Sequence, residues 1–380
     1  DSDQYYMAIA LLQAHTNIKD ASPNPCVGCV IVKDQKILSC AETKEYGGIH
    51  AERHAASFLS DKQLEKSTFY VTLEPCNHHG KQPPCTELII SKRIARVVIS
   101  VLDNDPLVSG QGIKKIKDHG IAVSTDVLAD CTRKLLYPFL ENRSSGKTVF
   151  IGKWAQSLDG ALCDYEGKSK WISSEKSRRY THWLRSKYDA IMIGSETVVK
   201  DTPSLDIREN FWFNKSKANP IRIIVDPSYK IFEAKNFLTF WPKLVGKDKR
   251  LLILTGKKPP RDKSKGFENY QKSKGFCFAA LDRENLVESI QTAVNSSEVE
   301  KRFSKKILSC LVEGGPSLLT LFISQGSFKL FHIFIAPFFM GGPNRIIKDL
   351  DNFPKQIAEV DRKEFSENYS LGDDILVELG

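Results

Sequence analysis

Residues 73–85 read LEPCNHHGKQPPC, and residues 50–52 read HAE. In these two stretches His50, Cys76 and Cys85 offer one imidazole and two thiols, a donor set that leaves the fourth position of a tetrahedral zinc open for water. Water bound at that position ionises near neutral pH and becomes a nucleophile. Glu52 lies two residues beyond His50 and is placed to carry a proton to a departing amine. The pattern predicts one catalytic Zn²⁺ per chain and hydrolysis of an amidine-type C–NH2 bond.

Other interpretations of these residues are less favoured. The nine cysteines could all be buried small apolar residues, the commonest fate of free cysteine, but the joint placement of His-x-Glu and Pro-Cys favours zinc. His50 and His54 are spaced like the histidines of a helix-borne metalloprotease, but that motif has its glutamate directly after the first histidine. His54 is therefore expected to be a helix-surface or core residue. Cys26 and Cys29 form a Cys-x-x-Cys beside a strand-like apolar run, so a redox role is not favoured.

The flanking sequence predicts where the three zinc ligands lie. Residues 51–59 have helical composition and follow two glycines, which places His50 at a helix N-terminus. Pro83 and Pro84 predict a second helix that starts near Cys85, where the helix dipole favours a thiolate. Residues 67–73 alternate and are rich in Thr, Phe, Tyr and Val, as in a strand. The site is thus expected at a strand end between two helix starts.

Eight residues separate Cys76 from Cys85, whereas many zinc deaminases have Cys-x-x-Cys there, and a loop of this length can bring its own polar groups to a pocket. With this loop the chain resembles the bifunctional deaminase/reductase family of riboflavin biosynthesis, whose first domain carries HAE and an LEPCxHxGKxPPC run. Residues 23–28 and 106–112 resemble two further signatures of that domain. The resemblance implies an N-terminal domain with the cytidine-deaminase-like α/β/α fold.

The resemblance also implies a substrate, 2,5-diamino-6-(5-phosphoribosylamino)pyrimidin-4(3H)-one, which is deaminated at ring C2. On this interpretation Asn24 hydrogen-bonds the heterocycle, and His78 and Lys81 meet the ribose phosphate, although a loop lysine is more usually a solvated surface residue. Two positions depart from the family pattern. Thr43 stands where members tend to have histidine, and Asn104 stands where they have the first proline of Asp-Pro-x-Pro. Neither change touches the zinc chemistry, but either can alter turnover or substrate fit.

The length of 380 residues predicts two domains. A polar stretch with glycine and serine, residues 141–147, is the expected linker. With the family pattern, this predicts a zinc-dependent pyrimidine deaminase domain at residues 1–143 and an NADPH-dependent reductase domain at residues 147–380. Residues 1–146 contain 17 basic and 17 acidic side chains, so the whole net charge of +9 lies in the second part. Such an excess suits phosphate-bearing ligands, although scattered surface lysines give the same count.

The second part alternates strand-like and helix-like segments. Strands of a mostly parallel sheet are predicted at residues 148–154, 191–194, 221–226, 251–254 and 307–312. No Gly-x-Gly-x-x-Gly follows the first of them, so the Rossmann fingerprint is absent. Instead VEGGPS, residues 312–317, opens a helix after a strand, and free glycine amides at a helix start suit a pyrophosphate. Gly-Gly-Pro alone is a weak signal and is often only a turn.

Short motifs at residues 157–160, 169–172, 197–205 and 313–315 resemble the reductase half of the same family. They imply a C-terminal dihydrofolate-reductase-like α/β domain that uses NADPH to reduce the ribosyl group to ribityl. The positions that match the family's cofactor site are Ala155, Trp171, Thr197, Asp201, Gly315, Pro316, Ser317, Leu318, Leu319, Thr320 and Leu321. The positions that match its substrate site are Ser169, Arg185, Leu205, Arg208 and Glu313. Arginine suits a phosphate because its guanidinium offers paired donors. The ordinary alternatives are a core aromatic for Trp171, a helix-surface charge for Arg185 and a turn residue for Asp201.

No cationic segment followed by an apolar one opens the chain, and no apolar run is long enough to span a bilayer. The first residue is Asp, which leaves the natural N-terminus open. An odd number of cysteines, three of them assigned to zinc, favours a reducing compartment, so the protein is expected to be soluble and cytoplasmic. The expected partners are the small phosphorylated pyrimidine and further copies of the chain in a homo-oligomer, with no nucleic acid and no membrane.

Two other functions remain open from the sequence. One is a nucleobase or transfer-RNA deaminase with an unrelated appended domain, although the neutral first part lacks the basic surface expected for nucleic acid. The other is a non-catalytic binding module that keeps zinc for stability. Loss of Glu52 or of a ligand would mark such a module, and all of these residues are present.

Overall fold

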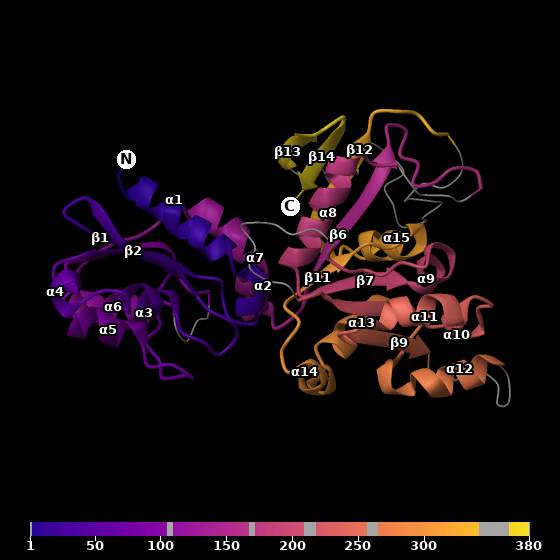
Figure 1. Ribbon diagram of the computed structural model, residues 1–380, viewed down its shortest axis with the longest axis horizontal. Coiled ribbons are helices and arrows are strands. Elements are labelled where there is room, and N and C mark those ends of the chain that lie inside the picture. The colour runs from indigo at the N-terminus through magenta and orange to yellow at the C-terminus, as the bar shows by residue number, and fades with distance from the viewer. Residues whose placement is uncertain are drawn as a thin grey trace. The chain divides into compact units, whose positions relative to one another are not determined.

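The computed structural model describes residues 2–104, 109–166, 172–208, 218–256, 265–341 and 365–379. The chain forms two compact units (Figure 1). Residues 1–147 make up the body of the first, and residues 148–209 with 219–380 make up the second. In the described ranges there is no helix both long enough and apolar enough to cross a bilayer.

The first unit is built on a sheet that has five strands in the described residues, in the order β2-β1-β3-β4-β5. β1 (Gly28–Lys33) pairs antiparallel with β2 (Lys36–Glu42) and with β3 (Thr68–Leu73), whereas β3, β4 (Arg96–Val101) and β5 (Ala122–Ser124) are parallel. The run GCVIVK of β1 is buried on both faces, which suits its β-branched residues. Because β3 and β4 run parallel, both end at the same edge of the sheet. The segments that follow the two strands therefore begin at the same edge.

Helices cover both faces of this sheet. On one face α1 (Ser2–His15) buries Met7 and Ala10 against the outward side chains of β1 and β3. It lies so close that a Cβ on Gly28 would stand 1.8 Å from the carbonyl oxygen of Ala10, so only glycine fits there. The remaining helices are α2 (Ile18–Ala21), α3 (Ala51–Ala56), α4 (Asp61–Leu64), α5 (Cys85–Ser91), α6 (Gln111–Asp118) and α7 (Ala129–Ser145).

The polar stretch at residues 141–147, expected as the linker, is mostly helical. α7 continues to Ser145, and Gly146 ends it with φ 70°, in the left-handed region that favours glycine. The hydroxyls of Ser144 and Ser145 donate to the carbonyl oxygen of Glu141, which lets serine remain in the last helical turn. The chain therefore leaves the first unit through a capped helix rather than through an irregular segment.

The second unit contains a sheet with nine strands in the described residues, in the order β10-β9-β8-β7-β11-β6-β12-β14-β13. Strands β10 to β12 of this order run parallel, and the β13–β14 hairpin joins β12 antiparallel. The five predicted strands are confirmed as β6, β7, β8, β9 and β11, with ends shifted by up to three residues. The bounds are β6 Val149–Ser157, β7 Ala190–Gly194, β8 Ile221–Asp226, β9 Leu251–Gly256, β10 Cys277–Leu281, β11 Ser309–Val312, β12 Phe328–Ala336, β13 Phe365–Leu371 and β14 Asp374–Leu379.

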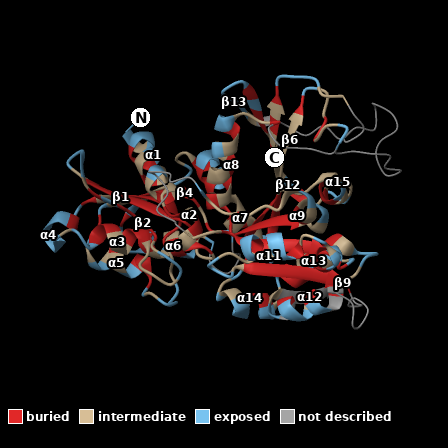
Figure 2. Ribbon diagram, turned by 45° about the vertical axis from the view of Figure 1, so that its right-hand side comes forward, coloured by how far each residue is buried: buried red, intermediate tan, exposed pale blue. Residues whose placement is uncertain are grey.

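Helices lie on both faces of this sheet as well, and its strands are the most deeply buried part of the unit (Figure 2). Residues of α13 and α15 share one apolar cluster with β7, β8 and β11, and residues of α9, α10 and α11 share another with the opposite faces of β7, β8 and β9. The bounds are α8 Glu175–Lys187, α9 Ser195–Asp201, α10 Lys230–Glu233, α11 Phe237–Val245, α12 Lys265–Ser273, α13 Leu286–Val294, α14 Ser297–Phe303 and α15 Pro316–Ser324.

Candidate functional site

Three predicted zinc ligands converge in the first unit. His50 is the residue that caps α3, Cys76 follows the end of β3, and Cys85 is the first residue of α5. The Nδ1 atom of His50 lies 3.5 Å from the Sγ atoms of both cysteines, and the donor atoms of the three residues all lie within 4.8 Å of one another. Tetrahedral zinc with bonds of about 2.3 Å to sulfur and 2.0–2.1 Å to nitrogen holds such donors about 3.5 Å apart. The donor set and its spacing therefore fit a zinc ion.

The electrostatics of this cluster favour binding of a cation. A hydrogen bond from the Cys85 thiol lowers the pKa of Cys76, with a further contribution from His50, while the same contact and burial raise the pKa of Cys85. One sulfur is thus held as a thiolate, and the second proton leaves when a metal binds. Glu52 is buried, and that burial raises the pKa of its carboxyl, as does the charge of Cys76. A raised pKa favours the protonated form of the carboxyl, which can donate a proton to a leaving amine.

Arg53 fixes the loop that carries Cys85. Its Nε and Nη2 atoms donate to the carbonyl oxygens of Pro83 and Pro84 at 3.0 and 2.8 Å, respectively. The contact thereby holds the start of α5, which carries Cys85, against α3, whose start carries His50. This contact could not be predicted from the sequence, because thirty residues separate the two segments.

Glu74 is a second residue that sequence reasoning missed. Its buried carboxylate accepts backbone N–H groups from Gly110 and Gly112, both at 3.0 Å, and longer bonds from Asp103 and Ile113. A Cβ on Gly112 would stand 2.3 Å from the carbonyl oxygen of Pro75, so the chain can pass there only as glycine. Glu74 thus joins the peptide that precedes Cys76 to the segment that follows β4.

The positions expected to touch the pyrimidine substrate are exposed or half-buried. Lys81 is exposed, with its Nζ atom 3.9 Å from the ring centre of Tyr46, and His78 is also exposed. Asn24 is half-buried, and its backbone N–H donates to the carbonyl oxygen of Ala21. Thr43 is buried, and its hydroxyl accepts the backbone N–H of Val27 at 3.2 Å. Of the signature at residues 106–112, residues 106–108 lie outside the described part of the chain.

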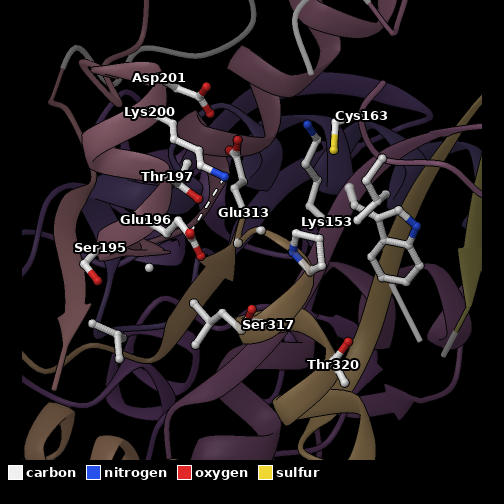
Figure 3. Close-up of a pocket in the computed structure, with 18 of the residues that line it drawn as sticks. Lys153, Cys163, Ser195, Glu196, Thr197, Lys200, Asp201, Glu313, Ser317 and Thr320 are labelled. Carbon is white, nitrogen blue, oxygen red and sulfur yellow. Dashed lines mark ion pairs between the residues drawn. The ribbon is translucent and has the colours of Figure 1, made fainter. Parts of the chain in front are cut away.

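The second unit has a cavity of about 1200 Å³ at the C-terminal ends of β6, β7, β8 and β11. Ligands of open α/β sheets bind at this edge of parallel strands. Figure 3 shows side chains from several of these elements directed into the cavity. Expected cofactor residues that line it are Ala155, Thr197, Asp201, Gly315, Pro316, Ser317, Leu318, Thr320 and Leu321. Leu319 is fully buried in the core instead, and Trp171 and Ser169 lie outside the described residues.

An anion-binding element lies within this lining. Gly315 caps α15 and Pro316 is its first residue, so the free backbone amides of the first turn face the cavity along with Ser317. The Thr197 hydroxyl lies only 3.4 Å from where a Cβ on Gly315 would stand.

Arg185 and Glu313, both expected to bind substrate, bind each other. Nε and Nη2 of Arg185 meet Oε1 and Oε2 of Glu313, each at 2.8 Å, and both side chains are largely buried. Burial opposes ionisation of Glu313, but Arg185 and Lys153 outweigh it and lower its pKa to about 2. Glu313 also lines the cavity, so the cavity wall carries a carboxylate that Arg185 holds in place. Arg185 is therefore not a helix-surface charge.

Lys153 is a charged residue that the sequence reasoning did not select. It belongs to β6, lines the cavity and is half-buried, and this partial burial lowers the pKa of its amine, with Glu313 acting in the opposite direction. Figure 3 shows its side chain on the same side of the cavity as Glu313. A lysine two residues before Ala155, inside a predicted buried strand, was the available signal.

The last two expected substrate residues differ from each other. Arg208 lines the cavity and pairs with Asp206 at 3.4 Å. Leu205 is buried in the apolar cluster beneath α9, with φ 54°, so its side chain serves packing and only its backbone is free to meet a ligand.

Comparisons with known proteins agree with this two-part organisation. Residues 148–376 match the model of the RibD C-terminal domain, and residues 1–101 match that of the cytidine and deoxycytidylate deaminase zinc-binding region. The riboflavin biosynthesis protein RibD of Aquifex aeolicus is 35% identical over 375 residues, covering 99% of this chain and 97% of the relative, and that of Escherichia coli is 30% identical over 400 residues, covering 99% of both.

Solved structures show the same relationship. The RibD structure of Acinetobacter baumannii superposes with a TM-score of 0.82 at 28% identity and covers 100% of this chain and 98% of its own. The Thermotoga maritima protein titled diaminohydroxyphosphoribosylaminopyrimidine deaminase/5-amino-6-(5-phosphoribosylamino)uracil reductase gives a TM-score of 0.79 at 30% identity, with the same coverage. The fold is therefore shared over the whole length.

Proposed function

This chain belongs to the RibD family of riboflavin biosynthesis proteins, and we propose that its first unit deaminates the pyrimidine substrate while its second unit reduces the ribosyl group. Membership makes the chain a bifunctional deaminase and reductase that acts on a small phosphorylated pyrimidine and uses Zn²⁺ and NADPH. The first unit has the cytidine-deaminase-like fold and the second the fold of the family's reductase domain. The observation that carries the division is the separate placement of a His/Cys/Cys cluster and a large cavity with a glycine-capped helix start, one in each unit.

In the first unit His50, Cys76 and Cys85 would hold the zinc, which would supply a water activated for attack on ring C2. Glu52 accepts a proton from that water and delivers a proton to the leaving nitrogen, so the C–N bond breaks and ammonia departs. Its burial supports this role, because a carboxyl shielded from solvent exchanges protons with the substrate rather than with bulk water. Asn24, His78 and Lys81 are the proposed substrate contacts.

In the second unit Ala155, Thr197, Asp201 and the start of α15 would hold the dinucleotide, and the first-turn amides of α15 would offer donors to its phosphate oxygens. Bound there, NADPH would supply the hydride that reduces C1 of the ribosyl group. Glu313 and Arg185 orient the sugar beside the cofactor, and Lys153 donates the proton that the opened ring oxygen needs. The lowered pKa of Lys153 supports proton donation, because a buried amine gives up its proton more readily than a solvated one. Trp171, Ser169, Leu205 and Arg208 complete the proposed site.

The other functions weighed from the sequence are not favoured. A nucleobase or transfer-RNA deaminase with an unrelated second domain does not account for a match of residues 148–376 to the reductase domain of this family. A zinc-stabilised binding module does not account for the buried Glu52 beside the ligands.

We also infer a cytoplasmic location and a homo-oligomer without nucleic-acid or membrane partners. Cys29, Cys40, Cys131 and Cys310 are free thiols, which supports a reducing compartment. Sedimentation of the purified chain measures its oligomeric state directly.

The proposed order of reactions is tested by incubating the full chain with the diaminopyrimidinone phosphate and identifying the products by mass. Without NADPH, the product should show replacement of one amino group by oxygen and no further change. With NADPH, a second product should gain two hydrogens. Reduction that precedes deamination would contradict the proposed order, and no ammonia release with zinc bound would contradict the deaminase assignment.

A further inference from the structure

The hairpin of β13 and β14 holds the first turn of α8. Ser174, the residue that caps the start of α8, donates its backbone N–H to Oδ2 of Asp374 at 2.7 Å, and the Ser177 hydroxyl donates to the same oxygen at 2.6 Å. The Ser174 hydroxyl donates to the carbonyl oxygen of Leu371 at 3.0 Å. Asp374 is buried, so these hydrogen bonds take the place of its contacts with water. The start of α8 is therefore fixed by β14.

His332 of β12 connects the other end of α8 to the same hairpin. Tyr188 caps the C-terminal end of α8, and its hydroxyl oxygen lies 2.9 Å from Nε2 of His332. Nδ1 of His332 lies 2.8 Å from Oε1 of Glu378 in β14. A carboxylate oxygen can only accept a hydrogen bond, so the proton of a neutral imidazole belongs on Nδ1, and Nε2 is left to accept the Tyr188 hydroxyl. The hairpin thus contacts α8 directly at its start and through His332 at its end.

Lys153 stands in the same row of the sheet. His332 is in register with Lys153 of β6 on one side and with Glu378 on the other, so the three side chains project from one face of the sheet. α8 covers this face, because the ring of its Tyr180 packs against Phe334, two residues after His332, with 6.1 Å between the ring centres. His332 is buried beneath the helix and lies one strand away from the amine proposed to donate the proton.

The groups that face His332 favour its neutral form. Burial lowers the pKa of the imidazole, Glu378 acts in the opposite direction, and Lys187 and Lys153 lower the pKa further. A proton on His332 would therefore add a buried positive charge near two lysines. The other titratable groups on the elements packed around it are Tyr180, Arg185 and Tyr188 of α8 and its cap, Glu313 after β11, and Glu367 of β13. Burial raises the pKa of both tyrosines, which keeps them uncharged, and the arginine is paired with Glu313.

α8 carries groups of the reductase cavity. Arg178 lines the cavity, and Arg185 holds Glu313 in place. Arg185 precedes Tyr188 by three residues, which is less than one helical turn, so movement of the helix end moves its guanidinium as well. The contacts that fix the two ends of α8 therefore set the position of the carboxylate in the cavity wall.

We propose that the β13–β14 hairpin holds α8 at both ends, and that neutral His332 is the positioning residue that keeps Arg185 and Glu313 aligned for the sugar of the pyrimidine. The proposal rests on the proposed reductase function of the second unit. Protonation of His332 would put a hydrogen on Nε2, to which the Tyr188 hydroxyl could then no longer donate. The contacts at this end of α8 should therefore weaken in acid, with a rise in KM for the pyrimidine and little change in KM for NADPH.

The test follows KM for the deaminated pyrimidine from about pH 8 to about pH 5, the range in which histidine titrates. KM of the parent should rise as the pH falls. Glu378→Gln removes the charge that favours a protonated ring, so the rise should begin at lower pH. Tyr188→Phe removes the donor that favours a neutral ring, so the rise should begin at higher pH. Each displacement should be about one pH unit, which is a tenfold change in proton affinity.

The opposite signs of the two displacements separate this role from packing alone. The phosphate of the substrate also titrates near about pH 6, but it is the same for every variant. Asp373→Asn and Tyr369→Phe make equivalent chemical changes at exposed positions of the same hairpin and should follow the parent. Displacements of the same sign, or a KM that does not depend on pH, would overturn the role of His332.

A spectroscopic measurement separates this proposal from the proposed function. Nitrogen NMR of the full chain with isotope-labelled histidine reads the state of His332 without turnover, and loss of its signal in His332→Gln or His332→Asn identifies it. The signal should show the neutral Nδ1–H form near neutral pH, and its titration should be displaced in opposite directions in Glu378→Gln and Tyr188→Phe. A proton on Nε2 of the neutral ring would overturn the proposal. The expected signals in a chain that does not oxidise NADPH would overturn the reductase assignment and leave the contacts of His332 with α8 and the hairpin supported.

Discussion

Arg185 of α8 and Glu313 at the end of β11 form two parallel hydrogen bonds of 2.8 Å although they stand 128 residues apart in the chain. This pair connects a covering helix to the strand end that forms the wall of the cavity. Because both groups are largely buried, each depends on the other for compensation of its charge. The same two residues were expected from the sequence to bind substrate, and their pairing fixes the geometry in which they can do so.

The pair predicts that the free energy of unfolding of the second unit falls in acid. The pKa of Glu313 in the folded protein, about 2, lies below its ordinary value of 4.5, so the stability that its charge contributes is present above about pH 4.5 and is lost as the pH falls through about 2. The shift corresponds to a contribution on the order of 3 kcal/mol. Glu313→Gln should lower the free energy of unfolding of the second unit at pH 6, and its difference from the parent should shrink toward pH 2. Urea unfolding at several pH values measures this difference, and a difference that stays constant with pH would contradict the ion pair.

Removal of a zinc ligand should affect only the deaminase. Cys76→Ser is expected to lose zinc, as measured by elemental analysis, and to lose ammonia release with it, because serine is not deprotonated at neutral pH to supply the anionic ligand. NADPH oxidation with the deaminated substrate should continue. Cys131→Ser, a change at an exposed cysteine, is the matched control and should keep the parental zinc content.

Glu74 should govern substrate affinity rather than metal binding. Glu74→Gln replaces one of two carboxylate oxygens by a donor, so backbone N–H groups of Gly110 or Gly112 lose their acceptor. The segment after β4 should then loosen, raising KM for the pyrimidine by about tenfold, the value of one hydrogen bond to a charged group. Zinc content should stay parental, and Glu87→Gln on the exposed side of α5 should change neither quantity. Loss of zinc in Glu74→Gln would show instead that this residue supports the metal ligands.

Lys153 should be required for reduction alone. Lys153→Met keeps the length of the side chain and removes its proton, so NADPH oxidation should fall by about 10²–10⁴-fold, the usual contribution of a general acid. Ammonia release should be unchanged. Lys301→Met on the exposed face of α14 is the control for loss of a lysine. Parental NADPH oxidation in Lys153→Met would remove this residue from the mechanism.

Much of the deaminase site could be predicted from sequence because its ligands stand at signals that local chemistry sets. Glycines precede His50, prolines precede Cys85, and an alternating strand precedes Cys76, so helix starts and a strand end were predictable and are confirmed. Glu74 escaped notice because its partners are backbone amides about thirty to forty residues away. No sequence pattern predicts which side chain accepts hydrogen bonds from such distant backbone N–H groups.

The second unit was predicted less completely. The strands that were found are short and uniformly apolar, as buried parallel strands are. β12 was missed because the polar residues Lys329 and His332 interrupt its apolar pattern. β14 was missed because it carries Asp374 and Glu378. His332 is buried between Tyr188, 2.9 Å from its Nε2, and Glu378, 2.8 Å from its Nδ1, so a long-range polar contact offsets what the local pattern disfavours. The pairing of Arg185 with Glu313 is likewise visible only once the sheet is assembled.

The most direct test of the account is a paired measurement on Glu52→Gln and Glu313→Gln in the full chain. Both variants are assayed for ammonia release from the diaminopyrimidinone phosphate and for NADPH oxidation with the deaminated intermediate supplied. Glu52→Gln should retain zinc, lose about 10²–10⁴-fold in ammonia release and oxidise NADPH at the parental rate. Glu313→Gln should release ammonia at the parental rate and lose NADPH oxidation. Equal damage to both activities in either variant would contradict the division of the two reactions between the two units.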